Sequence, residues 1–62
     1  MNSIKTIRHI KNMSAEFVAR ELGVSRQTIV NWEIGKTEPG ASQIRAMCEL
    51  FGVAAEELLK EG

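Results

Sequence analysis

Glycine residues divide this chain into short segments, which restricts the structures open to it. Gly23, Gly35 and Gly52 each follow a stretch of apolar residues at helical spacing. A glycine there typically ends a helix, because it adopts a left-handed backbone without strain. Ser14 and Ser25, residues of the type that caps helix N-termini, precede two of these stretches. No segment shows the alternation of apolar and polar residues that marks a strand. The sequence therefore predicts an all-α fold.

Five short helices are predicted from the apolar spacing and these end signals. The first covers about residues 3–11, the second follows Ser14 and ends at Gly23, and the third runs from Arg26 to about Glu33. The fourth covers about residues 41–51 and the last about residues 55–60. Their inward apolar side chains are expected to form one core: Met13, Val18, Ala19, Leu22, Ile29, Trp32, Ile44, Met47, Cys48, Phe51 and Leu58.

Composition excludes several classes of function. With 62 residues, the chain has room for one domain, which we place at residues 1–62. One cysteine and one histidine cannot supply a tetrahedral zinc site. Since aspartate and tyrosine are absent and His9 is the single histidine, few catalytic sets can be assembled, and we expect no enzymatic activity. We also expect no cofactor, no metal and no small-molecule ligand. No apolar run approaches the ~20 residues that span a bilayer, so a cytoplasmic location without membrane contact is expected.

Charge is divided unevenly along the chain, although the formal net charge is zero. Residues 1–36 contain six basic and three acidic side chains, a balance of +3. Residues 37–62 contain two basic and five acidic side chains, a balance of −3. A net charge of zero by itself argues against a nucleic-acid partner. The uneven distribution is nevertheless compatible with one basic and one acidic face, and solvated surface charge is the alternative interpretation.

Residues 14–33 have the pattern of a helix-turn-helix motif, with two short helices joined by Gly23-Val24-Ser25. The small side chain of Ala19 allows the helices to cross closely, and Gly23 tolerates the sharp turn. Val24 is expected to fill the corner between the helices, and Ile29 to anchor the second helix. That helix then projects from the body, so that its N-terminal residues can reach base edges in the major groove of DNA.

The residues of this motif, SAEFVARELGVSRQTIVNWE, resemble the Cro/cI-type (XRE) helix-turn-helix family. The likeness continues through Gly35-Lys36, Pro39 and residues 50–53 to Glu57-Leu58-Leu59. The resemblance implies a five-helix, lambda-repressor-like DNA-binding domain with the helix-turn-helix at residues 14–33. It further implies a transcription regulator, bacterial or phage-encoded and usually dimeric.

The resemblance also implies which residues contact DNA. Arg26, Gln27 and Asn31 match the positions that read bases, and Val30 faces the same groove. Arginine pairs with O6 and N7 of guanine, glutamine or asparagine with N6 and N7 of adenine, and valine packs on the thymine methyl. The other members of this set are the cap Ser25 and the phosphate-contacting Thr28, Lys36, Thr37 and backbone N–H groups around Ala15.

Several positions depart from the family pattern. A glutamine that reaches a phosphate is usual at position 15, where Ala15 offers only its backbone N–H. A polar residue is common where Ile34 stands, so reduced affinity for DNA is expected. Ile10 and Phe17 are likewise apolar at positions that are usually polar. A cluster of such exposed apolar residues would mark an interface.

Two further sets of residues are implied by the resemblance. Arg8 and Glu33 match positions that form an internal ion pair between the first helix and the end of the third. The region of the last helix often pairs two copies of the domain, and Leu50, Ala55 and Leu59 are the apolar residues there that the core needs least. Leu59 is expected at the centre of a weak homodimer and Leu50 at its margin, whereas packing of Leu59 on the core is the alternative.

The function expected from these features is sequence-specific binding of double-stranded DNA by a homodimer at a roughly palindromic operator. We expect a transcriptional regulator, more specifically a repressor. The alternative is a protein-binding module, such as an antitoxin or adaptor, on the same fold. Ala15, Ile34 and the zero net charge favour that alternative, whereas Arg26, Gln27, Asn31 and Lys36 favour DNA.

Overall fold

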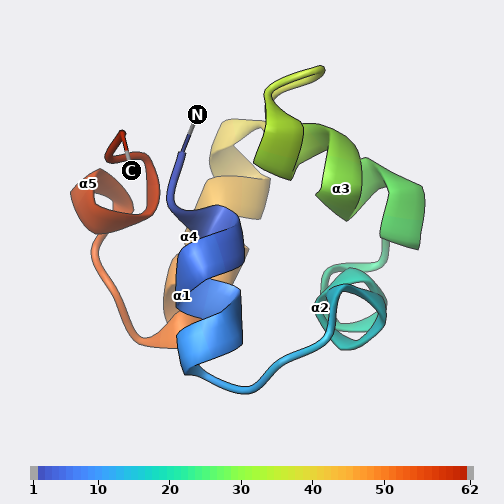
Figure 1. Ribbon diagram of the computed structural model, residues 1–62, viewed down its shortest axis with the longest axis horizontal. Helices are drawn as coiled ribbons and strands as arrows, with labels where there is room; N and C mark the ends of the chain where they lie inside the picture. Colours follow the sequence, from blue (N-terminus) through green and yellow to red (C-terminus); the bar gives the residue numbers. More distant parts are fainter. Residues whose placement is uncertain (1, 62) are drawn as a thin grey trace.

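The computed structural model describes residues 2–61, which fold into five helices and contain no strand (Figure 1). The helices are α1 (Ile4–Ile10), α2 (Ala15–Leu22), α3 (Arg26–Ile34), α4 (Ala41–Phe51) and α5 (Ala55–Leu58). This all-α, five-helix fold confirms the prediction from the sequence. The two ends of the predicted domain, Met1 and Gly62, lie outside the described residues.

The helix ends follow the local signals in the sequence. The side-chain oxygens of Ser14 and Ser25 accept hydrogen bonds from the N–H groups of Phe17 and Thr28, at the starts of α2 and α3. Gly23 ends α2 with a left-handed backbone at φ 72°. These bonds satisfy amide groups that the first turn of a helix leaves without a partner. The boundaries of α2, α3 and α4 therefore lie close to those predicted.

The helix α5 ends at Leu58, whereas the sequence analysis placed its end near residue 60. Carbonyl groups at the end of α5 and just after it accept hydrogen bonds from Ser3. The Ser3 N–H donates to the Leu58 carbonyl at 3.0 Å, and the Ser3 hydroxyl donates to the Lys60 carbonyl at 2.7 Å. These bonds join the two ends of the described chain side by side, close to α5 (Figure 1). The end of α5 thus lies about two residues earlier than the sequence analysis placed it.

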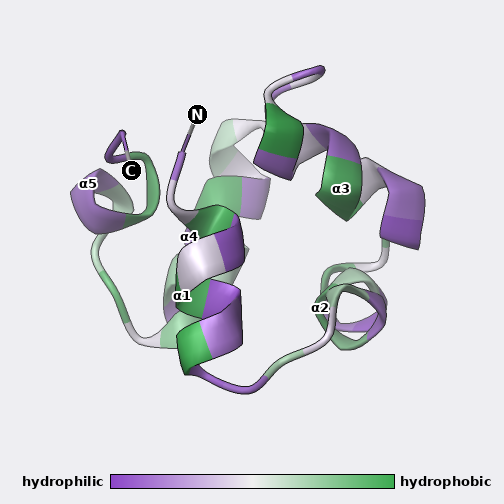
Figure 2. Ribbon diagram, viewed as in Figure 1, coloured by the Kyte–Doolittle hydropathy of each residue, from purple (hydrophilic) through white to green (hydrophobic). Residues whose placement is uncertain are grey.

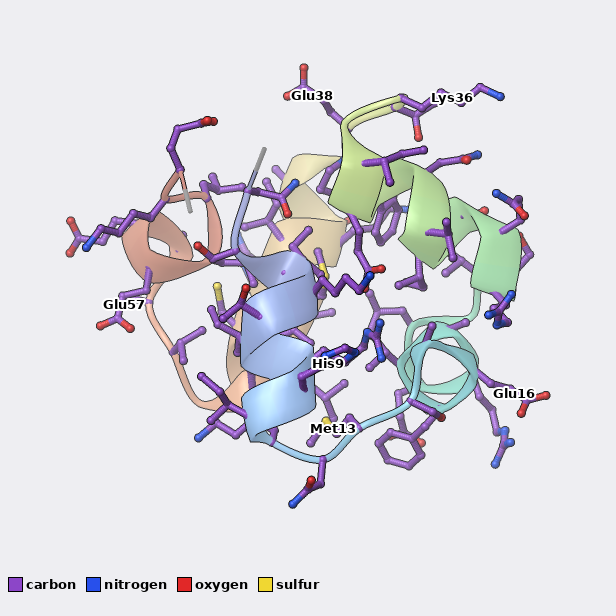
Figure 3. All side chains as sticks on the ribbon, viewed as in Figure 1. His9, Met13, Glu16, Lys36, Glu38 and Glu57 are labelled. Atoms are coloured by element: carbon purple, nitrogen blue, oxygen red, sulfur yellow. The ribbon has the colours of Figure 1, made fainter. Side chains whose placement is uncertain are left out.

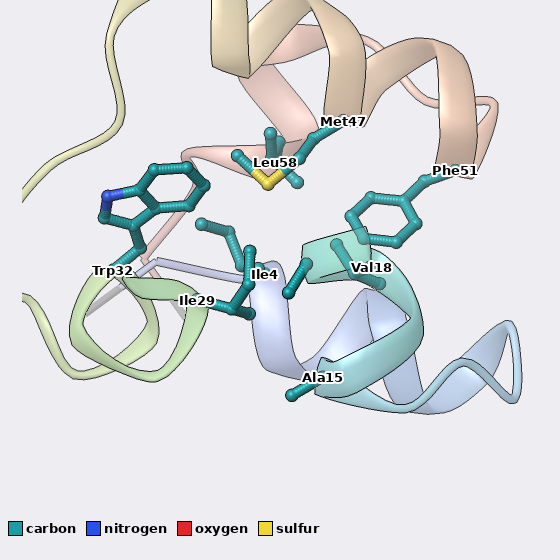
Figure 4. Close-up of a cluster of buried hydrophobic side chains, with 9 residues drawn as sticks. Ile4, Ala15, Val18, Ile29, Trp32, Met47, Phe51 and Leu58 are labelled. Carbon is teal, nitrogen blue, oxygen red and sulfur yellow. The ribbon is translucent and has the colours of Figure 1, made fainter. Parts of the chain in front are cut away.

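One hydrophobic core receives side chains from all five helices (Figure 4). Its fully buried members include Ile4 from α1, Val18 from α2, Ile29 from α3, Met47 from α4 and Leu58 from α5. Ala15, Ala19, Trp32 and Phe51 complete the buried set. The remaining residues predicted for the core, Met13, Leu22, Ile44 and Cys48, are half-buried and pack against it.

The helix-turn-helix occupies one side of the molecule. In Figure 1, α2 and α3 lie together on the right, α5 lies on the left, and α1 crosses in front of α4 between them. The residues at the start of α3 are strongly hydrophilic (Figure 2). The fold therefore presents α3 at the surface, at the opposite side from α5.

Candidate nucleic-acid interface

Burial of one side of α3 fixes which residues face solvent. Ile29 is fully buried and Trp32 nearly so, which holds the helix against the core. Residues three and four positions apart on a helix are neighbours on its surface, so Arg26 adjoins Val30 and Gln27 adjoins Asn31. Positions 27, 30 and 31 lie away from these two anchors, and Arg26 adjoins them in the exposed first turn. The four predicted base-reading positions form one continuous face.

The side chains of this face present hydrogen-bonding groups to solvent. Arg26 and Gln27 are exposed, and Val30 and Asn31 are half-buried. The Gln27 Nε2 group donates a hydrogen bond to Asn31 Oδ1 at 3.0 Å. Exposed guanidinium and amide groups at the start of a helix are the groups that read base edges. The structure thus brings all four residues to a single surface.

The turn before α3 has the geometry that the motif requires. Gly23 is left-handed, and the Val24 N–H donates to the Ala19 carbonyl at 2.9 Å. Val24 is half-buried against the core, and Ala19 is buried where α2 packs on α3. The Ser25 hydroxyl caps α3 and also lies 2.8 Å from the hydroxyl of Thr28. These contacts set the direction in which α3 leaves the turn.

The start of α2 offers backbone groups but a buried side chain. Ala15 is 7% exposed, so its methyl group belongs to the core rather than to the surface. The Ser14 hydroxyl caps the N–H of Phe17 at 3.0 Å. The N–H groups of Ala15 and Glu16, in the first turn, have no acceptor within the helix. This end can therefore approach an anion only through its backbone, as the sequence predicted.

Lys36 and Thr37 lie in the exposed loop between α3 and α4. Figure 3 shows the Lys36 side chain extending away from the body of the molecule. The Lys36 N–H donates to the Asn31 carbonyl at 2.9 Å, which ties the loop to the last turn of α3. The ammonium group is thus held near one end of the α3 face while remaining in solvent.

Arg8 and Glu33 form the ion pair that was predicted between α1 and α3. Arg8 Nε donates to Glu33 Oε2 at 2.7 Å, and Nη2 lies 3.5 Å from Oε1. Arg8 Nη1 also donates to the Met13 carbonyl at 2.9 Å. Both side chains are buried, with 8% and 5% of the residue exposed. The pair joins α1, the entrance to α2 and the last turn of α3.

The region from α1 to α5 corresponds as a unit to a known family. Residues 4–58 match the helix-turn-helix family model, and these bounds coincide with the start of α1 and the end of α5. The chain belongs to the Cro/cI-type helix-turn-helix family. This Cro/cI-type domain matches a family of transcriptional regulators over nearly all of its described length.

Three similar proteins carry related names. The chain is 39% identical over 57 residues to an uncharacterized helix-turn-helix transcriptional regulator of Methanocaldococcus jannaschii, covering 92% of this chain and 86% of that protein. It is 36% identical over 56 residues to a helix-turn-helix transcriptional activator of Enterococcus faecalis, covering 90% of this chain and 28% of that protein. It is 35% identical over 57 residues to an uncharacterized prophage-derived transcriptional regulator of Bacillus subtilis, covering 92% of this chain and 53% of that protein. The Cro/cI-type domain thus spans about half or less of two of these relatives.

The residues predicted for pairing lie at the α5 end of the Cro/cI-type domain. Ala55 is exposed and Leu59 is 44% exposed. Leu50 is half-buried and packs against the core. Less of its side chain is therefore available for pairing than the sequence analysis expected. Leu59 also borders a shallow pocket of about 340 Å³, which is lined by Asn2, Gly35, Glu38, Pro39, Leu59 and Glu61.

Asn2 and Ser3, the polar residues just before α1, have roles that the sequence analysis did not predict. Asn2 Oδ1 does accept from the Ile4 N–H at 3.0 Å, as a cap would. Its Nδ2 group, however, donates to the Trp32 carbonyl at 2.9 Å, and Ser3 bonds to the α5 end. Their partners are backbone carbonyls, for which the residue type gives no signal.

Within residues 2–61, no cluster of three or more histidine, cysteine, aspartate or glutamate side chains has the arrangement of a metal site. None of the described helices has the length and apolarity required to cross a membrane. His9 is exposed on α1 (Figure 3), and Cys48 is a half-buried free thiol beside the core.

Proposed function

We propose that this Cro/cI-type domain binds double-stranded DNA in a sequence-specific manner, with α3 in the major groove. The observation that carries the proposal is the face formed by Arg26, Gln27, Val30 and Asn31, which burial of Ile29 and Trp32 leaves outside the core. Arg26 pairs with guanine, the two amides with adenine, and Val30 with a thymine methyl group. Each well-formed pair discriminates against the wrong base by about 1–3 kcal/mol.

Contacts with phosphates position the domain on the duplex. Lys36 supplies a mobile positive charge, and Thr37 and Thr28 supply hydroxyl groups beside the α3 face. The free N–H groups at the start of α2, at Ala15 and Glu16, point toward an adjacent phosphate in this arrangement. The backbone replaces a side chain at position 15, which lowers the affinity of a single domain.

Two copies are required to read a full operator. The longest dimension of the domain is 23 Å, whereas successive major grooves on one side of DNA are about 34–36 Å apart. One copy therefore reads one half-site. We propose a weak homodimer that pairs through the α5 end, with Leu59 central, Ala55 beside it and Leu50 at the margin, and that binds a palindromic operator.

Binding by such a dimer represses transcription where the operator overlaps a promoter, because the bound protein excludes RNA polymerase without a second contact surface. The similar Enterococcus faecalis protein is named an activator. Whether this chain represses or activates transcription is therefore tested with a reporter gene. A reporter promoter with the operator placed inside it should be silenced, and one with the operator upstream should be unaffected.

The proposed setting is the bacterial cytoplasm, where chain and DNA share a compartment.

Selection of bound duplexes from a random pool tests the proposed function. The full chain should enrich a palindrome with half-sites about one helical turn apart. Changing Arg26, Gln27 and Asn31 together to Ala should abolish the enrichment, while Arg45→Ala, an exposed residue on α4, should leave it unchanged. Absence of any enriched sequence, or enrichment of the same palindrome by the triple variant, would exclude sequence reading by α3.

A protein-binding module is the second candidate. Ile10 is 70% exposed at the end of α1, and Phe17 is also exposed near the start of α2. Exposed large apolar side chains favour contact with another protein when they are contiguous. Under this function the chain would enrich no duplex, and Ile10→Ser with Phe17→Ser would release a bound protein without lowering the helical content.

A further inference from the structure

We propose that Asn31 acts as a positioning residue that orients the Gln27 amide to read adenine, so that the two side chains recognise one base as a unit. The inference rests on the proposed function, since it concerns the same α3 face. Its basis is the hydrogen bond from Gln27 Nε2 to Asn31 Oδ1 at 3.0 Å, between side chains one helical turn apart. Ile29 and Trp32 fix the helix beneath this pair.

The bond restricts the side chain of Gln27. A primary amide has two N–H donors and a carbonyl oxygen, and either end can face a base. Donation of one N–H to Asn31 leaves Gln27 with its carbonyl oxygen and its second N–H. Rotation of the Gln27 amide alone by half a turn would place its oxygen against the Asn31 oxygen, so the bond survives only if both amides turn together. The bond therefore couples the two amides and favours the described orientation as long as Asn31 presents its oxygen.

The groups left free on Gln27 match one base edge. Adenine presents the N6 donor beside the N7 acceptor in the major groove, which an amide oxygen and an N–H pair with directly. Guanine presents two acceptors, O6 and N7, so the Gln27 oxygen would be left facing an acceptor. Fixing the amide thus favours adenine over guanine. It also lowers the ordering cost of binding, because the amide is oriented before DNA arrives.

The position of Asn31 is compatible with this role. Asn31 is half-buried, whereas Gln27 is exposed at the N-terminal end of the helix, where base edges are reached first. The Asn31 backbone carbonyl accepts bonds from Lys36 and Thr37, and the side chain takes no part in them. Replacement of the Asn31 side chain therefore leaves the end of α3 intact.

Two substitutions at position 31 separate positioning from direct reading. Asn31→Asp keeps an acceptor for Gln27 Nε2, and Asn31→Ala removes it. Fluorescence anisotropy measures the affinity of the full chain for the duplex obtained by selection. The same measurement is made on duplexes in which each base pair is changed in turn. Wild-type protein should prefer adenine over guanine at one base pair by roughly five- to a hundredfold. Gln27→Ala should abolish this preference.

Asn31→Ala should lower the same preference by about fivefold, the equivalent of one ordinary hydrogen bond, and Asn31→Asp should retain it. The negative charge of the aspartate should weaken binding to all duplexes alike through repulsion of phosphates. In a Gln27→Ala background, Asn31→Ala should have no further effect on the preference. Circular dichroism melting of each variant checks that the helices remain folded.

Other outcomes overturn the inference and are distinguishable from failure of the proposed function. An Asn31→Ala effect at a different base pair, or an equal effect in the Gln27→Ala background, would show that Asn31 reads a base independently while DNA recognition stands. Loss of the adenine preference in Asn31→Asp would exclude the acceptor role. A wild-type chain that enriches no sequence overturns the proposed function and this inference together.

Discussion

Arg8 joins three parts of the molecule, namely α1, the segment before α2 and the last turn of α3. Its guanidinium group donates to the Glu33 carboxylate and to the Met13 carbonyl. The charges of Arg8 and Glu33 are almost removed from water, which costs free energy unless partners replace the lost hydration. Two short hydrogen bonds, to the Glu33 carboxylate and the Met13 carbonyl, and a longer contact at 3.5 Å provide that replacement. The angle of α3 relative to α1 is consequently tied to one charged pair.

Breaking the pair from one side should destabilise the domain strongly. Arg8→Ala leaves the Glu33 carboxylate buried without a partner and should lower the free energy of unfolding by about 3–5 kcal/mol. The double variant with Glu33→Ala should cost less than the sum of the two single changes. Urea denaturation at low temperature gives the free energy of unfolding of the wild type, the two single variants and the double variant. Replacement of the exposed Arg20 by Ala is the control. Strict additivity would contradict coupling between the two side chains.

Arg26 and Lys36 should lose DNA binding in different ways. Arg26→Ala should lower affinity for the selected operator by about 1–3 kcal/mol per half-site and relax preference at one base pair. Lys36→Ala should weaken binding to all sequences equally. It should also reduce the slope of log affinity against log salt concentration by about one. Titrations at several salt concentrations measure both, with Lys60→Ala as a charge-matched control at the α5 end. Equal losses on operator and random duplexes for Arg26→Ala would contradict base reading at that position.

The sequence predicted individual residues well where a side chain has a typical role. Ile29 and Trp32 are buried as their spacing indicated, and the likeness to the family placed Arg8 opposite Glu33. The bonds of Asn2 and Ser3 were not predicted, because backbone carbonyls have no residue-specific signal. The Gln27–Asn31 bond could have been anticipated, since polar side chains one turn apart on a helix often interact.

At the scale of the helices, boundaries were predictable wherever one residue decides them. Ser14 and Ser25 cap, and Gly23, Gly35 and Gly52 turn the chain, through interactions within a few residues. The surroundings of α5 are different, because Ser3 bonds to the carbonyls of Leu58 and Lys60. A contact between opposite ends of the sequence leaves no local pattern.

Gly23 provides a quantitative test of the turn in the helix-turn-helix. Its φ of +72° is unfavourable for residues with a side chain, although nothing lies within 4 Å of an added Cβ. Gly23→Ala should therefore lower the free energy of unfolding by about 1–2 kcal/mol, the cost of a left-handed backbone alone. Gly23→Asn should cost less, because asparagine tolerates this region. Thermal unfolding of both variants measures the difference; a larger cost for Asn would contradict a purely conformational origin.

At the scale of the whole molecule, part of the acidic charge lies far from α3. Glu56 and Glu57 lie on α5, at the opposite side from α3 (Figures 1 and 3). Acidic residues remote from the proposed DNA face do not oppose binding, which reconciles zero net charge with a nucleic-acid partner. The charge balance of the two sequence halves was compatible with one basic and one acidic face. The structure places Glu56 and Glu57 on α5, but it places Glu38 in the same loop as Lys36.

Leu59→Glu should separate pairing of two copies from folding. With 44% of Leu59 exposed, the variant should keep its helical content and bind a single half-site, but lose cooperative binding to the full operator. Circular dichroism melting and titrations with half-site and full-site duplexes measure the two properties. Ile10→Glu, which adds the same charge elsewhere, should retain cooperativity. Unfolding of Leu59→Glu would instead assign Leu59 to the core, and a folded variant with unchanged cooperativity would contradict pairing through this residue.

The bond between Ser3 and the Leu58 carbonyl also has a kinetic consequence. The first residues of a domain usually exchange their amide hydrogens with solvent almost freely. Here the Ser3 amide donates to the last residue of α5, so we expect it to be released together with α5, in an event that also breaks the bond from the Leu59 amide to the Ala55 carbonyl. Hydrogen–deuterium exchange followed by NMR should then give Ser3 and Leu59 similar protection, and free exchange of Ser3 alone would refute this coupling. With similar protection, residues at opposite ends of the described chain would leave the native state in one opening event.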